Sequence, residues 1–160
     1  MTLPLRRAED RDAQDLFGLL ALCFAEYPGC FVDPHDDLAD LRRPGASFRG
    51  PGEAFLVLED EGGRVCACVA VDASEPDLGE LHRLYVRPDR RGRGLATSLV
   101  AAAETVAREA GATRMRLWSD LRFADAHRLY ARLGYGSEGG TRALGDVSNS
   151  IEQGFARNLV

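Results

Sequence analysis

The sequence has no lysine: its 160 residues include 20 basic side chains, and every one of them is arginine. This absence excludes a Schiff-base lysine, a phosphate-loop lysine and any reaction on the chain's own side-chain amines. Cysteine and histidine are scarce, with four cysteines, three scattered histidines and no pair of CxxC spacings. These spacings favour reduced structural thiols, and no metal is expected. Cys66 and Cys68 lie two apart in an apolar run, so a strand would point both to one face.

Long apolar runs are absent as well. Residues 16–25 are apolar but too few to span a bilayer, and acidic residues precede them, unlike the basic leader of a signal peptide. We therefore expect a cytoplasmic protein with no membrane partner. Apolar residues make up 45% of the chain and charged residues 28%, which is typical of a globular fold. Because no repeat or linker divides the chain, one domain over residues 1–160 is expected.

The net charge of −5 is unevenly distributed. Residues 8–40 hold nine carboxylates and one arginine, a charge of −8, whereas residues 87–93 hold four arginines and one aspartate, a charge of +3. One interpretation is a pair of binding surfaces of opposite charge. The alternative for the acidic segment is a solvated helix face.

Hydrophobic periodicity predicts an alternation of strands and helices. Apolar or alternating runs indicate strands over 2–6, 54–59, 64–72, 79–86 and 113–119, with one or two more within 135–160. Apolar residues at helical spacing indicate helices over 10–26 and 34–42, from Leu95 to a stop at Gly111, and from Ala126 to a stop at Gly134. The order β-α-α-β-β-β-α-β-α-β(β) predicts an α/β fold, with helices on both faces of a mixed sheet.

The strongest chemical signal is a strand that continues into an arginine- and glycine-rich turn and then a helix, residues 84–96. Glycines let the backbone turn tightly beside a ligand, and the free N–H groups in the first turn of the helix attract anions. Arginines add bidentate donors for phosphate oxygens. The expected ligand therefore carries a phosphate or pyrophosphate group.

Three other sites for phosphate groups fit this turn less well. A P-loop needs a lysine, which the chain lacks. A dinucleotide-binding loop belongs to an early parallel βαβ unit, whereas the strand before this turn follows a hairpin. An RGG-type RNA contact needs interleaved aromatic residues, and the turn has none. No nucleic-acid partner is expected.

Two short motifs match a known family. Residues 91–96 fit the pattern Gln/Arg-x-x-Gly-x-Gly/Ala, and residues 126–135 fit Ala-x-x-x-Tyr-x-x-x-Gly-Tyr/Phe. With both motifs, and with the predicted element order over nearly the whole chain, the sequence resembles the GNAT superfamily of N-acetyltransferases. The resemblance implies a mostly antiparallel sheet, acetyl-coenzyme A (acetyl-CoA) as co-substrate and an amine as acceptor.

The resemblance also implies which residues bind the coenzyme. Backbone groups of Leu84, Tyr85 and Val86 would pair with pantetheine, and one of their N–H groups would hold the oxyanion of the reaction. The pyrophosphate would lie on the turn formed by Arg91, Gly92, Arg93, Gly94, Leu95 and Ala96, with Thr97 just inside the helix. Arg87 or Arg90 would reach the 3′-phosphate or the adenine edge, or would simply be solvated.

Glu80, six residues before Val86, matches the position of a general base in some members of the family. A base is needed because an amine with a pKa of about 10 is protonated at neutral pH and cannot attack. A water molecule could lie between Glu80 and the amine. His82, on the same strand face, is the alternative base. A third interpretation is that Glu80 only forms a salt bridge with an arginine, such as Arg83 or Arg116.

Tyr130 matches the family's general acid, which protonates the leaving thiolate. A coenzyme thiolate is a weak base, so this acid would be helpful but not essential. The alternative is that Tyr130 is a core residue at helical spacing. The sequence departs from the family pattern at Phe123, where many members have an asparagine that contacts pantetheine.

The acceptor would enter between the first helices and the final strands, beside residues 26–30 and 33–40. Their negative charge leads to the hypothesis of a cationic amine. Residues 139–142 and 146–149 would line the site or cap a turn. Three functions stay open: a small-molecule amine acetyltransferase, which is favoured, a protein acetyltransferase, and a silent acyl-CoA-binding module. The oligomeric state is also open, with a homodimer among the alternatives.

Overall fold

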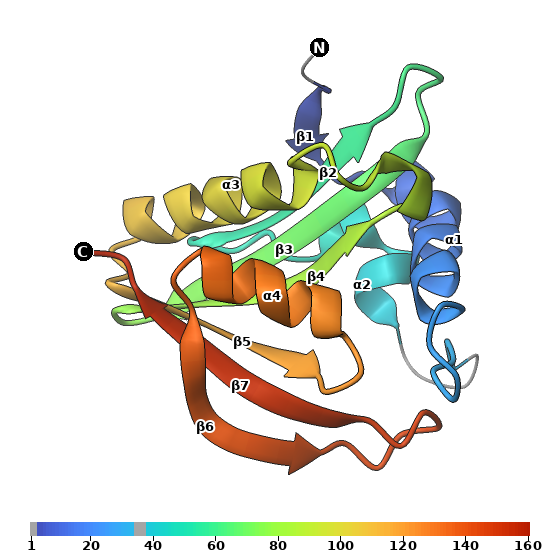
Figure 1. Cartoon of the computed structure of the whole chain (residues 1–160). Helices are drawn as coiled ribbons and strands as arrows, with labels where there is room; N and C mark the ends of the chain where they lie inside the picture. The colour runs from blue at the N-terminus through green and yellow to red at the C-terminus, as the bar shows by residue number, and fades with distance from the viewer. Residues whose placement is uncertain (1–2, 34–37) are drawn as a thin grey trace.

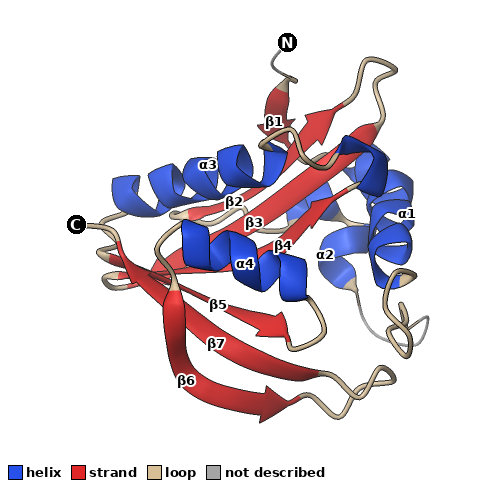
Figure 2. Ribbon diagram, viewed as in Figure 1, coloured by secondary structure: helices blue, strands red, loops and turns tan. Residues whose placement is uncertain are grey.

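A computed structural model describes residues 3–33 and 38–160 of the chain. Within these residues, seven strands form one sheet in the order β1-β2-β3-β4-β5-β7-β6, and every neighbouring pair is antiparallel except β4 and β5. Helices cover both faces of this sheet (Figures 1 and 2). The predicted fold class and element order are confirmed.

The observed elements lie close to the predicted ones. The strands are β1 (Leu5–Arg7), β2 (Glu53–Glu59), β3 (Val65–Glu75), β4 (Leu78–Val86), β5 (Arg114–Asp120), β6 (Gly136–Ala143) and β7 (Ile151–Asn158). The α-helices are α1 (Ala13–Phe24), α2 (Ala39–Arg42), α3 (Leu95–Glu109) and α4 (Ala124–Arg132). Short 3₁₀ turns are η1 (Asp10–Asp12), η2 (Pro44–Ala46) and η3 (Pro88–Arg90). Residues 34–37, part of the predicted second helix, and Thr2, part of the first strand, lie outside the described residues.

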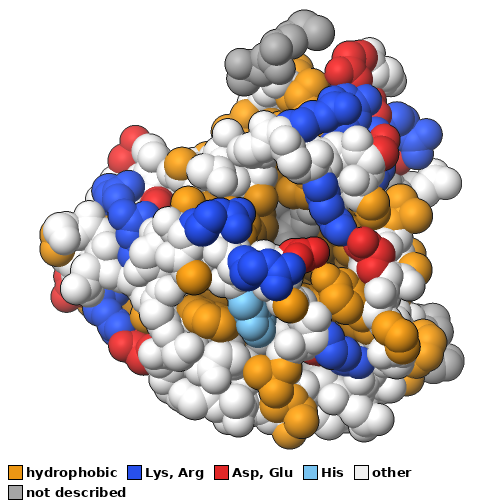
Figure 3. All heavy atoms as spheres, viewed as in Figure 1, with side chains coloured by type: hydrophobic (Ala, Val, Ile, Leu, Met, Phe, Trp, Pro, Cys, Tyr) orange, Lys and Arg blue, Asp and Glu red, His pale blue; other side chains and the backbone are white. Residues whose placement is uncertain are grey.

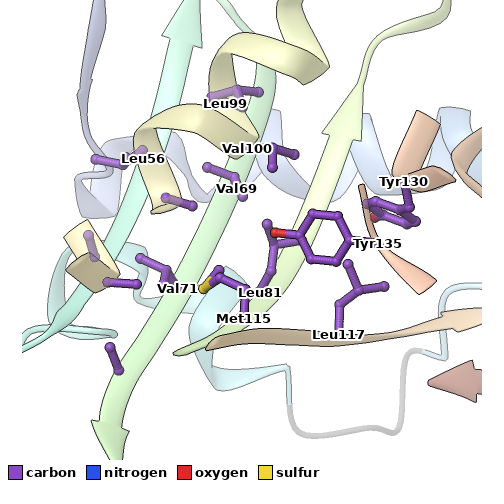
Figure 4. Packing of buried hydrophobic residues seen from close by; sticks show 14 of the residues in the cluster. Leu56, Val69, Val71, Leu81, Leu99, Val100, Met115, Leu117, Tyr130 and Tyr135 are labelled. Atoms are coloured by element: carbon purple, nitrogen blue, oxygen red, sulfur yellow. The ribbon is translucent and has the colours of Figure 1, made fainter. Parts of the chain in front are cut away.

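Two hydrophobic clusters pack on opposite faces of the sheet, because successive strand side chains point to opposite sides. Leu56 and Leu58 of β2 belong to the cluster under α3, whereas Phe55 and Val57 belong to the cluster under α1 and α2. Figure 4 shows the first cluster, in which β3 and β5 side chains meet Leu99 and Val100 of α3. The central strands are therefore buried on both faces. Among the described residues, no helix has the length and apolar character needed to cross a membrane.

A β-bulge in β3 overturns the prediction for its two cysteines. Leu58 and Glu59 of β2 pair with Ala67 and Val65, so one extra residue, Cys66, is inserted on β3. The inserted residue shifts the alternation of side chains. Cys66 packs in the α3 cluster and Cys68 in the α1 cluster, and the prediction that both point to one face is wrong.

A second bulge separates β4 from β5. Ala70 and Cys68 of β3 pair with His82 and Tyr85, so β4 carries one extra residue there. Arg83 within this bulge has a φ of 54°, in the left-handed region that side chains other than glycine rarely adopt. The parallel pairing of β4 with β5 stops just before the bulge, at Leu81. Beyond it the two strands diverge, as Figure 1 shows, and residues 82–86 of β4 pair with no strand of the described residues on that side.

Candidate active site

Two pockets open where β4 and β5 diverge. The first, the turn cleft, has a volume of about 420 Å³ and lies between the 91–97 turn, residues 84–86 of β4, the end of α1 and one face of α4. The second, the sheet pocket, has a volume of about 280 Å³ and lies over β4, β5, β6 and β7. Both are lined by Leu84, Tyr85, Phe123 and Ala126. A ligand in one pocket can therefore contact a ligand in the other along β4.

The arginine- and glycine-rich turn begins α3, as the sequence predicts. Gly92 and Gly94 both have a φ of 77°, and Gly94 is the residue before the helix. A side chain added at either glycine would meet no atom within 4 Å, so the backbone here borders open space. The N–H groups at the start of α3 and this uncovered backbone are suited to a phosphate group.

Arginines of the turn are already paired with carboxylates from other elements. Arg91 donates to Glu26 at 2.8 Å and also to the carbonyl of Val86, which ties the turn to α1 and β4. Both terminal nitrogens of Arg90 donate hydrogen bonds to the carboxylate of Glu61 in the β2–β3 hairpin, at 2.9 and 2.6 Å. The +3 charge predicted for this segment is therefore largely matched, and the turn is held in place rather than free in solvent.

Nine of the ten residues expected to bind the coenzyme line the turn cleft, and Arg93 does not. Of the two further candidates, Arg90 lines the cleft. Arg87 instead pairs with Asp60 and Asp89 outside it.

Sequence reasoning missed the arginines on the opposite wall of the turn cleft. Arg128 and Arg132 of α4 line it and are four residues apart, so they lie on one face of the helix. Arg128 also pairs with Asp125, one turn earlier. Figure 3 shows arginine side chains on both sides of the hollow between α4 and the start of α3. The i, i+4 spacing could have indicated this second basic wall.

The sheet pocket contains the predicted base. Glu80 accepts a hydrogen bond from Arg116 Nε at 2.6 Å, and its other oxygen is 3.6 Å from His82 Nε2. Burial lowers the pKa of His82, so its imidazole is neutral at neutral pH. Glu80 thus forms one of the salt bridges that the sequence analysis named, while its side chain, 20% exposed, still borders the pocket. Arg83, the other arginine named there, pairs with Asp40.

Tyr130 is both a core residue and a pocket residue. Its ring packs against Tyr135 and Phe155, with centroids 5.9 Å from each, and the whole residue is 5% exposed. It nevertheless lines the sheet pocket. Burial, together with the nearby Tyr85, raises the pKa of the Tyr130 phenol, so the hydroxyl stays protonated at neutral pH and can donate a proton. Figure 4 shows Tyr130 at the edge of the core, beside Tyr135.

Four carboxylates line the sheet pocket, and each is paired with an arginine. The pairs are Asp40 with Arg83, Glu80 with Arg116, Asp120 with Arg122, and Glu152 with Arg142. A site made of matched pairs does not attract cations as an unpaired acidic surface would.

The acidic amino-terminal segment is also used largely in structural pairs. Asp12 binds Arg6, Asp15 binds Arg64, and Glu26 binds Arg91. Of the four aspartates proposed to attract a cationic acceptor, Asp40 lines the sheet pocket and Asp33 does not, whereas Asp36 and Asp37 lie outside the described residues. The hypothesis of a cationic acceptor stays a prediction, and the described residues supply little unpaired charge for it.

The cysteines and the metal-binding side chains form no further centre. All four cysteines are buried and free. Within residues 3–33 and 38–160, no group of three or more His, Cys, Asp or Glu side chains could hold a metal ion.

The fold and the two adjacent pockets agree with those expected of an acetyl-CoA-dependent N-acetyltransferase, and comparison with known proteins identifies the family. A family model described as "Acetyltransferase (GNAT) family" matches residues 14–135, and the chain belongs to this family. The uncharacterized N-acetyltransferase YjgM of Escherichia coli (strain K12) is 38% identical over 135 residues, which are 82% of this chain and 80% of that protein. The aminoalkylphosphonate N-acetyltransferase of Salmonella typhimurium is 43% identical over 58 residues, only 36% of this chain and 38% of that protein.

Solved structures have the same fold. A GNAT-family acetyltransferase from Staphylococcus aureus superposes with a TM-score of 0.81 at 14% identity, over 99% of this chain and 100% of that one. A phosphinothricin acetyltransferase from Sinorhizobium meliloti, solved with acetyl-CoA, gives a TM-score of 0.70 at 21% identity, over 99% and 89% of the two chains. At these identities the likeness is one of fold.

Proposed function

We propose that this protein transfers the acetyl group of acetyl-CoA to the primary amine of a small molecule. The observation that carries the proposal is the meeting of the two pockets along β4. The turn cleft, which is lined by arginines and suited to phosphate groups, adjoins the sheet pocket there. The sheet pocket contains the carboxylate of Glu80 and the protonated phenol of Tyr130. Direct attack of an amine on a thioester needs this arrangement, because the two substrates must meet at one point.

The turn cleft would hold the coenzyme. Backbone N–H groups of the 91–97 turn, supported by Arg90, Arg91, Arg128 and Arg132, would bind the phosphate groups. On the side towards β5, residues 82–86 of β4 pair with no strand within residues 3–33 and 38–160, so this edge offers backbone donors and acceptors to pantetheine. One N–H of this edge would stabilise the negative charge that develops on the carbonyl oxygen. Such donors do not move during the reaction, so they add little reorganisation cost.

Glu80 would act as the general base. The hydrogen bond from Arg116 Nε at 2.6 Å holds the Glu80 carboxylate in place at the wall of the sheet pocket. Glu80 would take the proton from the acceptor ammonium, directly or through a water molecule, and leave a neutral amine to attack. His82 is the competing base, because it lines the same pocket and is neutral at neutral pH.

Tyr130 would act as the general acid. Its raised pKa keeps the hydroxyl protonated until the thiolate of the coenzyme leaves. Proton transfer at this stage would assist departure of the thiolate. Because a thiolate is already a fair leaving group, the expected contribution is smaller than that of the base.

The size of the sheet pocket favours a small acceptor over a protein chain. At about 280 Å³ it lies just below the range of about 300 to 1,000 Å³ that is typical of small-molecule sites. The relative that is named for aminoalkylphosphonates supports the same choice of acceptor size. A peptide acceptor would need an open groove.

Acetyl transfer with the intact chain tests this proposal. Purified protein is mixed with acetyl-CoA and a panel of small amines, amino acids and peptides, and release of the coenzyme thiol is measured. We expect turnover with small amines, a loss of about 10²- to 10⁴-fold in kcat for Glu80→Gln, and a loss of about tenfold for Tyr130→Phe. Glu138→Gln is the matched control, because Glu138 also pairs with an arginine, Arg114, but lines neither pocket.

Other outcomes would assign a different function. Coenzyme binding with no turnover on any acceptor would indicate a silent acyl-CoA-binding module. Turnover on peptides alone would indicate a protein acetyltransferase. Full activity in Glu80→Gln with loss in His82→Gln would transfer the role of base to His82.

A further inference from the structure

Arg142 places a positively charged guanidinium in the wall of the sheet pocket, where two other side chains hold it. Its guanidinium carbon lies 4.2 Å from the centroid of the Trp118 ring, and its Nε donates to Glu152 Oε1 at 2.9 Å. The three residues come from three adjacent strands, β6, β5 and β7. All three line the pocket. The aromatic ring and the carboxylate together fix where the guanidinium lies.

Two glycines lie against the Trp118 ring, and one of them, Gly154, leaves no room for a side chain. A side chain on Gly154 of β7 would place its first carbon 3.3 Å from the Trp118 ring, and one on Gly139 of β6 would place it at 3.5 Å. The carbon at Gly154 would also collide with the carbonyl of Glu138 at 2.1 Å. Here β6 carries an irregular register against β7, between Ser137 and Thr141. The absence of a side chain at Gly154 thus leaves space for the indole that supports Arg142.

Arg142 has hydrogen-bonding capacity left over. Glu152 accepts from its Nε and lies 2.8 Å from its Nη2, and no described residue accepts from its Nη1. A guanidinium has five N–H donors, so at least two remain for a ligand. Their directions are restricted by the Trp118 ring, which covers one face of the guanidinium. A planar or tetrahedral acid group is the ligand that such donors match best.

The charge of the whole pocket indicates the rest of the acceptor. The four lining carboxylates and their four arginine partners cancel, so neither a dication nor a simple anion is favoured. Glu80 would receive the amine, as proposed above, and Arg142 is a separate positive group on another strand. A small acceptor with one amine and one acid group would satisfy both.

We propose that the acceptor is a small zwitterion, an amine that also carries a carboxylate or phosphonate, and that Arg142 on Trp118 recognises its acid group. The inference rests on the proposed acetyltransferase function and names the acceptor class of the same site. Arg142 is in this view a determinant of specificity: it binds the acid group and takes no part in proton transfer.

The test compares three kinds of small primary amine that differ in the group at the other end of the molecule. This group is an acid in 2-aminoethylphosphonate and β-alanine, a methyl group in propylamine, and a second amine in 1,3-diaminopropane. Thiol release gives kcat and KM for each. We expect kcat/KM to be highest for an acid-tailed acceptor, about 10- to 100-fold above propylamine, and lowest for the diamine. In Arg142→Gln the ratio of kcat/KM for the acid-tailed acceptor to kcat/KM for propylamine should fall towards one, mainly through a higher KM for the acid-tailed acceptor.

A matched control and a second variant make the result specific. Arg114→Gln removes a comparably exposed arginine that pairs with Glu138 in the same sheet but lines neither pocket, and it should keep the full preference. Glu152→Gln should reduce the preference by less than Arg142→Gln does, because Arg142 loses one of the two groups that fix it but keeps its ring contact and its donors. A preference for propylamine or the diamine, an unchanged preference in Arg142→Gln, or a larger loss of preference in Glu152→Gln than in Arg142→Gln would overturn this inference but not the proposed function. No turnover with any amine would overturn the proposed function, and this inference with it.

Discussion

At the scale of single residues, buried carboxylates are matched by arginine, whose planar fork can bind both oxygens of a carboxylate. Arg6 donates to the two oxygens of Asp12 at 2.8 and 2.9 Å. Glu104, 5% exposed, accepts from Arg157 at 2.9 Å and from the Tyr135 hydroxyl at 2.8 Å. A lysine is a point charge and could not reproduce the paired contacts of Arg6. The absence of lysine is therefore compatible with a fold rich in ion pairs.

The buried thiol of Cys68 should make the protein less stable at alkaline pH. Burial raises the pKa of its thiol from 9.0 to about 12, so the unfolded chain loses this proton at lower pH than the folded one. The stability due to this group is complete below pH 9 and is lost as pH rises from 9 towards 12. Urea unfolding should show wild type losing about 2 kcal/mol more than Cys68→Ala between pH 8 and 10.5. Parallel pH curves for the two proteins would contradict this.

At the scale of elements, the start of α3 shows how local sequence sets a site. Positive φ values at Gly92 and Gly94 turn the chain from β4 into the helix, and the ion pair between Arg91 and Glu26 fixes the turn against α1. The same glycines leave backbone uncovered towards the turn cleft. Conformation and binding capacity thus come from the same two residues.

The substitution Gly94→Ala tests separately the effect of this glycine on the conformation of the turn and its effect on coenzyme binding. The new side chain would meet no protein atom, so the loss of stability should be only the backbone cost of a left-handed alanine, about 1 kcal/mol. We also expect a several-fold higher KM for acetyl-CoA, because the methyl group points into the space that the coenzyme would occupy. The measurements are urea unfolding and acetyl-CoA titration.

Gly63→Ala is the matched control for that experiment. Gly63 has a φ of 78° in the β2–β3 hairpin, and its added side chain would also meet nothing within 4 Å. The Gly63→Ala variant should lose about as much stability as Gly94→Ala, with no change in KM for acetyl-CoA. An equal rise in KM in both variants would show that strain, not contact with the coenzyme, is responsible.

At the scale of the whole molecule, the site exists because the sheet opens. The β4–β5 ladder stops at Leu81, and the bulge at Arg83 turns the end of β4 away. Both pockets lie along the exposed edge that results. The central sheet and its two clusters hold this opening in place.

Hydrogen exchange should detect the coenzyme on this edge. Amides within residues 82–86 that point towards β5 have no strand partner in the part of the chain that the structure describes. They should exchange quickly in the free protein and slow on addition of acetyl-CoA. Amides of residues 91–97 should respond in the same way. Residues 78–81, already paired with β5, serve as the internal control and should not change. Protection confined to other segments would place the coenzyme elsewhere.

Sequence patterns predict the local parts of this molecule well and the long-range parts poorly. The order of the elements and the turn at Gly92 and Gly94 follow from periodicity and glycine placement, which are local properties. The faces of Cys66 and Cys68 could not be predicted, because a single bulge in strand register reverses them. The stack of Arg142 on Trp118 could not be predicted either, since it joins different strands. The sequence named Arg116 as one of two arginines that could pair with Glu80, and only the structure selects it.

Arg83 lines the sheet pocket and also shapes β4, so a redesign of the acceptor site affects both. Its backbone lies in the bulge that parts β4 from β5, while its side chain holds Asp40 and so anchors α2 to the sheet. Substitutions at Arg83 or Asp40 intended to change the acceptor would also disturb the strand that the coenzyme needs. Trp118, Arg142 and Glu152 lie on β5, β6 and β7 and line only the sheet pocket. Libraries for new acceptors should therefore begin with those three positions and leave Arg83 fixed.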